Sequence, residues 1–141
     1  MIRHARRWLA VPMILGLAFV SASCGGGDEG GVSATLADFS ITLDSSSAPA
    51  GEVTFDVSND AEQTHEFVVF QTDLPPDQLP TNEDGDVDEE GEGVTLVDEI
   101  EDIEGGSSQS LTVNLEAGSY VLICNLPGHY QQGMHASFSA S

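Results

Sequence analysis

Lysine is absent from this sequence, and arginine occurs only near its start. The 141 residues include three Arg, at positions 3, 6 and 7, against 24 Asp and Glu, which gives a formal charge of −21 at pH 7. Proteins that bind nucleic acid use Lys and Arg to contact phosphates, so this composition excludes nucleic acid as a partner. A surface of this charge suits a basic protein partner or a saline medium.

Long apolar runs are also scarce, and the clearest one lies at the N-terminus. The three Arg precede an apolar run at 9–20, and small residues follow at 21–23. This order is typical of a secretory signal peptide, and the run is too short for a permanent transmembrane helix. We therefore predict that residues 1–23 are removed during export, which lowers the formal charge from −21 to −24 because all three Arg are lost. The Arg6–Arg7 pair leaves open a twin-arginine route beside the general secretory route.

Cys24 follows the small residues directly and precedes a Gly-rich stretch. The arrangement resembles a bacterial lipobox, in which the Cys is acylated and becomes the mature N-terminus, although Ser21 stands where Leu or Val is usual. We predict a lipid anchor at Cys24, a flexible tether over 24–31, and a periplasmic or cell-surface location. Plain secretion, with Cys24 free or in a disulfide, is the alternative.

The remaining residues, 32–141, suffice for one domain, and their apolar residues recur with a period of two. Residues 36–43 also alternate, with a phase slip near Ala37 and Asp38 that predicts a β-bulge. Turn-forming residues separate the runs, and no stretch has the period of an amphipathic helix. The pattern predicts an all-β fold, an antiparallel sandwich or barrel. The other strand-like runs lie at 53–57, 67–70, 111–115 and 120–124.

The segment 72–104 differs in composition from the rest of the domain. Three Pro residues interrupt regular structure, and a run of acidic residues occupies 82–92. We predict an acidic excursion that is solvated because its charges repel one another, with a return to the sheet at 94–100. Alternate Asp residues in the run resemble the start of a calcium-binding EF-hand loop, but the following Gly, the distal Glu and the flanking helices are missing.

Three potential metal ligands lie close together near the C-terminus. Cys124, His129 and Met134 follow the pattern Cys-x4-His-x4-Met. One thiolate, two imidazoles and a weak axial thioether form the ligand set of a blue-copper site, whereas Met is not a usual zinc ligand. A nucleophilic Cys–His pair is possible in principle, but no orienting acid is evident and Met134 would have no role. The spacing therefore predicts a copper site.

The second imidazole has to come from elsewhere in the chain. His65 is the better candidate, because it precedes the apolar strand at 67–70 and a sandwich can bring that strand end beside Cys124. His135 directly follows Met134, and neighbours in an extended segment point to opposite faces. We therefore leave His135 outside the predicted site.

These two segments resemble parts of the small cupredoxins. Residues 120–134 are similar to the C-terminal copper loop of that family, with the ligand spacing of the rusticyanin and sulfocyanin type. Residues 59–69 resemble the segment that carries the family's first His ligand. The resemblance covers 32–141 apart from the acidic excursion and implies a Greek-key β-sandwich with one copper ion. The implied ligands are His65, Cys124, His129 and Met134.

The resemblance implies a mononuclear blue-copper electron-transfer protein and not an enzyme. In the family the C-terminal His ligand is the electron port, which would be His129 with Leu126, Pro127 and Tyr130 around it. A copper enzyme would need further His-rich sites, and only His135 is left over. Copper delivery or storage is the alternative function, and it requires exposed ligands.

Expected partners are extracytoplasmic redox proteins, and the acidic surface suggests electrostatic steering toward a basic one such as a c-type cytochrome, or toward a membrane oxidase. The protein is expected to be a monomer.

The sequence departs from the family pattern at one position near the first His ligand. Several family members have Asn or Ser after the first His, where it ties that strand to the Cys loop, and here the position is Glu66. Asn59 and Thr64 are candidates to make this connection instead.

Overall fold

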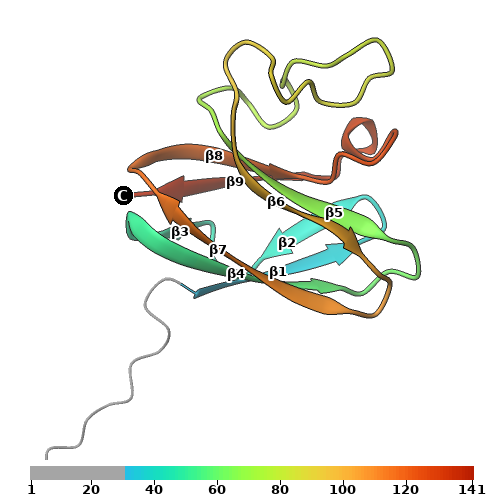
Figure 1. Cartoon of the computed structure of the whole chain (residues 1–141), viewed down its shortest axis with the longest axis horizontal. Helices are drawn as coiled ribbons and strands as arrows, with labels where there is room; N and C mark the ends of the chain where they lie inside the picture. The colour runs from blue at the N-terminus through green and yellow to red at the C-terminus, as the bar shows by residue number, and fades with distance from the viewer. Residues whose placement is uncertain (1–30) are drawn as a thin grey trace, which may run out of the picture.

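The alternating runs form the strands of two facing sheets (Figure 1). The computed structural model describes residues 31–141, so the predicted signal peptide, the lipid anchor and almost all of the tether lie outside the described residues. Within the described part of the chain, no helix has the length and apolar character needed to cross a membrane. The elements are β1 (Gly31–Ala37), β2 (Ser40–Leu43), β3 (Ser47–Ala48), β4 (Gly51–Asn59), β5 (His65–Gln71), β6 (Thr95–Ile103), β7 (Ser108–Leu115), β8 (Gly118–Ile123), the short 3-10 helix η1 (Tyr130–Gln132) and β9 (His135–Ala140).

The two sheets confirm the predicted all-β sandwich. One has the strand order β2-β1-β4-β7 and the other the order β3-β9-β8-β5-β6. The prediction that all strands are antiparallel is wrong, because β1 pairs with β4 and β3 pairs with β9 in parallel. Between the two strands of each parallel pair, the chain contributes at least one strand to the other sheet. The sequence could not predict this, because the alternation of side chains is the same in parallel and antiparallel strands.

Alternating side chains from both sheets fill the space between them. Phe55, on β4, is fully buried and contacts two aromatic rings of the facing sheet. Its ring centroid lies 5.4 Å from that of Phe67 and 5.2 Å from that of Phe138. Burial of a side chain of this size stabilises the fold by about 1.5–3 kcal/mol, so this cluster fixes the two sheets against each other.

The phase slip predicted as a bulge is a tight turn between β1 and β2. The two strands pair antiparallel, with Leu36 opposite Ile41. Between them, Phe39 has a φ of 58°, a left-handed conformation that is uncommon for residues other than Gly. The alternation restarts on the returning strand, which is why a turn and a bulge give the same signal in the sequence.

The acidic segment 72–94 connects β5 to β6 and folds over the outer face of the five-stranded sheet (Figure 1). The chain returns to the sheet at Thr95, in agreement with the prediction. The prediction of a solvated loop is wrong for its apolar residues, because Leu79 and Val87 are only 5% and 3% exposed. β5 and β8 carry apolar side chains on both faces, so the outer face of the sheet needs a cover. This second apolar cluster comprises Val68, Phe70, Leu79, Val87, Val121, Ile123 and Tyr130.

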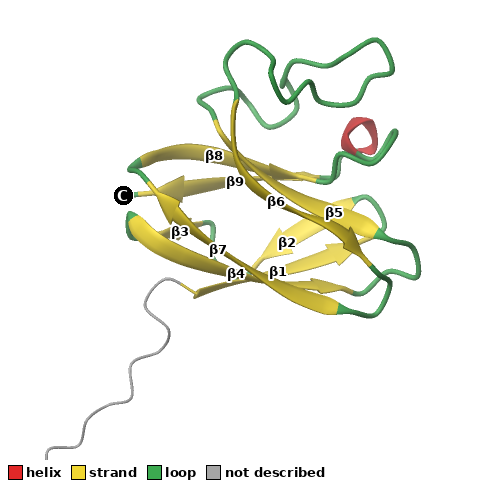
Figure 2. Cartoon of the chain, viewed as in Figure 1, coloured by secondary structure: helices red, strands yellow, loops and turns green. Residues whose placement is uncertain are grey.

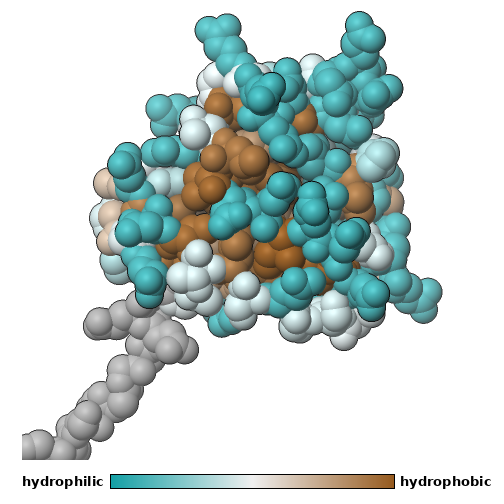
Figure 3. Space-filling model, in the orientation of Figure 1, coloured by the Kyte–Doolittle hydropathy of each residue, from teal (hydrophilic) through white to brown (hydrophobic). Residues whose placement is uncertain are grey.

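Hydrophilic side chains nevertheless project from the excursion at the top of the domain, whereas hydrophobic atoms are visible across the middle of the same face (Figure 3). The excursion therefore has an apolar inner side and a charged outer side. Its exposed acidic residues are Asp73, Asp77, Glu83, Asp84, Asp88, Glu90 and Glu92.

Candidate metal centre

Two adjacent strands of the five-stranded sheet bring distant ligand candidates together. β5 begins at His65, and β8 ends directly before Cys124. The strands are antiparallel neighbours, with Val68 opposite Ile123. The start of β5 therefore lies beside the end of β8, and both candidates are at the same end of the sandwich.

The segment from Cys124 to Met134 closes on itself around η1 (Figure 2). The main-chain N–H of Cys124 donates to the carbonyl of Met134 (3.1 Å), and the N–H of Met134 donates to the carbonyl of His129 (3.2 Å). Gly128 and Gly133 have φ values of 80° and 99°, which side chains with a Cβ rarely tolerate. These two glycines allow the sharp turns that return the chain to Cys124. We refer to residues 124–134 as the ligand loop.

Three of the predicted ligand atoms face one another. The Nδ1 of His65 lies 3.2 Å from the Nδ1 of His129, and the Sγ of Cys124 lies 3.7 Å and 3.3 Å from these two atoms. The centre of such a triangle is about 2 Å from each corner, close to the distance at which nitrogen and sulfur ligands bind a transition metal. Among the described residues the Nε2 of His65 has no hydrogen-bond partner, and Nδ1 is the ring nitrogen that faces the other two donors.

Met134 is held beside this cluster by its main chain and by burial. Its side chain is fully buried and belongs to the same apolar cluster as Cys124. Its main chain is hydrogen-bonded to both Cys124 and His129. A thioether beside one thiol and two imidazoles is a donor set that fits copper better than zinc.

His135 lies outside the donor cluster. In the described residues, the group of His, Cys, Asp and Glu side chains close enough to share a metal ion consists of His65, Cys124 and His129. The His135 ring instead packs against the ring of Tyr130, with centroids 5.5 Å apart.

Burial shifts the pKa values of two of the donors, His65 and Cys124. Burial, and secondarily the neighbouring His129, lowers the pKa of His65, so its imidazole is neutral and has a free lone pair. Burial also raises the pKa of the Cys124 thiol, and hydrogen bonds from the N–H groups of Glu66 and Leu126 partly oppose this effect. The metal-free thiol therefore keeps its proton at neutral pH, and metal binding releases it.

β5 is tied to Cys124 through its main chain. The N–H of Glu66 donates to the Sγ of Cys124 (3.3 Å), a bond that does not depend on the side chain at this position. The side chain of Asn59 does not make this connection. It donates to the carbonyls of Gln63 and Ile103, each at 2.8 Å, and so fixes the turn before β5.

His129 is the one donor of the cluster with a partly exposed side chain. The ring of Phe39 contacts it edge-on, with centroids 5.3 Å apart, and Pro127 is exposed beside it. Tyr130, expected at this surface, is instead 7% exposed and belongs to the cluster under the acidic excursion. Sequence reasoning missed Phe39 because it lies in the turn between β1 and β2, far from the ligand loop in the sequence.

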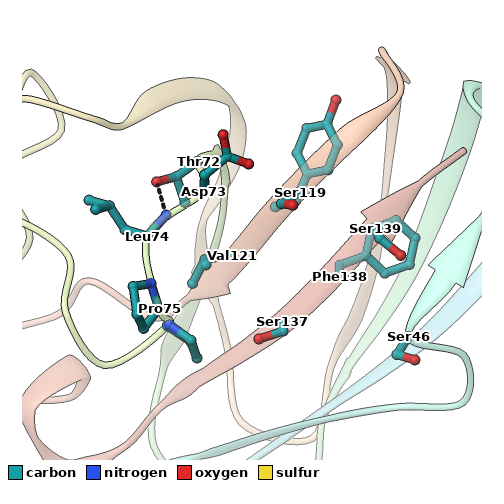
Figure 4. A pocket seen from close by; sticks show the side chains of 12 residues that line it. Ser46, Thr72, Asp73, Leu74, Pro75, Ser119, Val121, Ser137, Phe138 and Ser139 are labelled. Atoms are coloured by element: carbon teal, nitrogen blue, oxygen red, sulfur yellow. Dashed lines mark hydrogen bonds between the residues drawn. The ribbon is translucent and has the colours of Figure 1, made fainter.

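A groove on the outer side of the five-stranded sheet is separate from the donors (Figure 4). It lies between the start of the excursion and the outer side chains of β8 and β9, among them Ser119 and Ser137. At its rim, the hydroxyl of Thr72 accepts a hydrogen bond from the N–H of Leu74 (3.0 Å). None of the four predicted ligands lines this groove.

Comparison with known families agrees with this donor set. Residues 40–141 match the model of the sulfocyanin (SoxE) domain. The chain belongs to the sulfocyanin family. A comparison with curated protein sequences gives no match.

Solved structures of blue-copper proteins share the fold of this sulfocyanin-family chain. Reduced auracyanin from Roseiflexus castenholzii is 20% identical with a TM-score of 0.59, over 82% of this chain and 99% of the auracyanin. Auracyanin B is 21% identical with a TM-score of 0.57, over 79% and 88% of the two chains. Rusticyanin from Thiobacillus ferrooxidans is 18% identical with a TM-score of 0.53, over 79% and 78%. At these identities the likeness establishes the fold alone.

Family membership and the donor cluster together confirm copper as the cofactor. They also establish the general function, that of a blue-copper electron-transfer protein.

Proposed function

We propose that this sulfocyanin-family protein is an extracytoplasmic carrier of single electrons, held at a membrane by an acylated Cys24. His65, Cys124 and His129 would hold one copper ion, and the buried thioether of Met134 would be the fourth donor. Bound copper supplies reversible one-electron chemistry. The observation that carries the proposal is the convergence of the three donor atoms in a closed cluster with one partly exposed member.

Burial of the ligands favours electron transfer over catalysis or delivery. His65, Cys124 and Met134 are all fully buried, so a substrate or an acceptor protein has no direct access to them. The two sheets and the closed ligand loop hold the donors in one arrangement, because packed cores deform little. A site that keeps one geometry in both oxidation states needs little rearrangement when an electron moves.

The exposed edge of His129 is the proposed route to the partner. The Phe39 ring and Pro127 beside it offer a small apolar contact surface at this end of the sandwich. An apolar contact of this kind allows close approach of two proteins without the cost of desolvating charges.

Negative charge around this surface supports a basic partner. Asp38 is close enough to His65 to act on its pKa, and Asp86 accepts a hydrogen bond from the N–H of Gly128 (3.0 Å), next to His129. Residues 31–141 contain no Lys or Arg that would neutralise these carboxylates. We therefore propose a basic redox protein, such as a c-type cytochrome, as the partner.

Electron self-exchange and copper release, measured on the same copper-loaded protein, test the carrier function. A carrier exchanges electrons rapidly between its two oxidation states and loses copper slowly to an excess of chelator. Slow self-exchange together with rapid copper loss would reject the carrier and support delivery or storage. His135→Ala is the matched control, since it removes an imidazole next to Met134 without removing a proposed ligand.

Transfer of electrons to a basic cytochrome c at increasing ionic strength tests the proposed partner. The rate should fall with salt, because salt screens the attraction. Asp38→Asn should weaken this dependence while keeping the oxygen that accepts a hydrogen bond from Gln63. Glu52→Gln removes a charge from β4 and should leave the dependence unchanged. A rate that is insensitive to salt would count against a basic partner.

A further inference from the structure

The acidic excursion is attached directly to the ligand loop. Its segment 72–94 and the loop 124–134 meet on the outer side of the five-stranded sheet, where the loop appears beside the excursion (Figure 1). Tyr130 anchors the first part of this contact. Its hydroxyl accepts a hydrogen bond from the N–H of Leu79 and donates one to the carbonyl of Pro76, both at 2.9 Å.

Asn125, the residue after the thiol ligand, binds the main chain of the excursion. Its side-chain oxygen accepts a hydrogen bond from the N–H of Val87 (2.8 Å), and its side-chain nitrogen donates to the carbonyl of Val87 (3.1 Å). The same nitrogen donates to the Oε1 of Glu89 (3.0 Å). Three hydrogen bonds from one side chain therefore fix the chain directly after Cys124.

Asp86 makes the corresponding contact next to the exposed imidazole ligand. Its Oδ1 accepts a hydrogen bond from the N–H of Gly128 (3.0 Å), the residue before His129. The excursion presents this carboxylate in a defined position, because the side chain of Asn82 accepts hydrogen bonds from the N–H groups of Asp84 and Asp86.

We propose that residues 72–94 form a brace that holds the ligand loop in its copper-binding geometry, with Asn125 and Asp86 as positioning residues. This inference rests on the proposed copper site. The ligand loop also has main-chain hydrogen bonds of its own, from Cys124 to Met134, from His129 to Leu126 and from Met134 to His129. The excursion adds bonds from outside to the turn at 125–131, and these hold Asn125 and Gly128. Asn125 acts on the position of Cys124, and Asp86 acts on the position of His129.

The brace and the attraction of a partner depend on different properties of the Asp86 side chain. A docking surface needs the negative charge, whereas the brace needs an oxygen that accepts the Gly128 N–H. Asp86→Asn keeps an acceptor oxygen and removes the charge, and Asp86→Ala removes both. Asp84→Ala is the matched control, because it removes an equal charge two positions away and keeps the main-chain oxygen that binds Gln131.

Two measurements on these variants test the brace. The first is the rate of copper release to a chelator from the full-length copper-loaded protein. The second is the hydrogen-exchange rate of the Gly128 amide in the metal-free protein. Asp86→Ala should raise both rates about tenfold or more, and Asp86→Asn and Asp84→Ala should stay within about twofold of the wild type.

Two outcomes would overturn the proposal. Equal rates for Asp86→Ala and Asp84→Ala would show that the hydrogen bond does not hold the loop. Equal rates for Asp86→Asn and Asp86→Ala would show that only the charge matters. If Asp86→Ala does not fold, Tyr130→Phe is decisive, because it keeps the ring and removes two bonds to the excursion, and it should raise both rates. If the wild type binds no copper, the proposed function fails, whereas the exchange rates of the metal-free protein still decide on the brace.

Discussion

The Nδ1 atoms of His65 and His129 lie 3.2 Å apart although the residues are 64 positions apart in the sequence. His65 is fully buried, whereas His129 is partly exposed. Both imidazoles lie beside the Cys124 thiol, but the His65 ring is inside the sandwich and the His129 ring is at its surface. This difference makes them separable by experiment.

His129→Gly should open a gap that a small ligand can fill from solvent. The copper-loaded variant should lose the wild-type spectrum and regain it when free imidazole is added, because the gap is at the surface. His65→Gly should not be restored in this way, since its gap lies inside the sandwich. The optical spectrum during an imidazole titration measures both.

His135→Gly is the control for this experiment. The side chain packs against Tyr130 and not against the donors, so the variant should keep the wild-type spectrum without added imidazole. Loss of the spectrum in this control would mean that His135 is a ligand in place of one of the others.

Substitutions of Met134 should move the reduction potential in two directions. Met134→Leu removes the thioether and should raise the potential, because Cu(II) loses a donor, and it should cost less than about 1.5 kcal/mol of stability because the two side chains have similar volumes. Met134→Gln offers a harder oxygen donor that favours Cu(II) and should lower the potential. Voltammetry measures both, and an unchanged potential in both variants would remove Met134 from the site.

The contribution of Glu99 to stability should fall as the pH rises through the mildly acidic range. Burial first, and then the neighbouring carboxylates of Glu89, Glu101 and Asp98, raise the pKa of Glu99 above its ordinary value of 4.5. The folded state then binds the proton more tightly than the unfolded state, so this group's contribution to stability is lost as the pH rises from 4.5 through the raised pKa.

Glu99→Gln should flatten this pH dependence, and added salt should reduce the part of it that the neighbouring carboxylates cause in the wild type. Chemical denaturation of the two proteins across the pH range measures the free energy of unfolding. The comparison between wild type and variant cancels the pH dependence of the copper ligands, which both share. If the free energy of unfolding varied with pH in the same way in both proteins, Glu99 would not be the source of this pH dependence.

The sequence predicted those parts of the fold that depend on local alternation. Val53, Phe55 and Val57 are buried on β4, in agreement with their period of two. β9 was not predicted, although Ala136 and Phe138 alternate with serines, because its small side chains give a weak apolar signal.

The pairing of distant segments was harder to predict than the strands themselves. The contact of Phe39 with His129 and the hydrogen bond from the Glu66 N–H to the Cys124 Sγ depend on the fold of the whole domain. A main-chain N–H donor cannot be predicted from the residue type, because every residue except proline has one. Cys124, His129 and Met134 could be predicted from the sequence because these residue types are rare in this chain and regularly spaced. His65 could be predicted because it precedes an apolar strand.

The acidic excursion shows where composition misled the prediction. Its charge predicted a solvated loop, but Leu79 and Val87 are buried against the outer face of β5 and β8. The signal was present in the strands, where apolar residues occupy both faces at 67–70 and 120–124. Strands of that kind require a cover on each side.

The optical and paramagnetic spectrum of the Cu(II)-loaded protein shows whether the Cys124 sulfur binds copper. We expect an intense thiolate-to-copper charge-transfer band that disappears in Cys124→Ser, because the Cys124 sulfur lies within 3.7 Å of both imidazole donors. A colourless copper complex of the wild type, or a band that survives in Cys124→Ser, would contradict it.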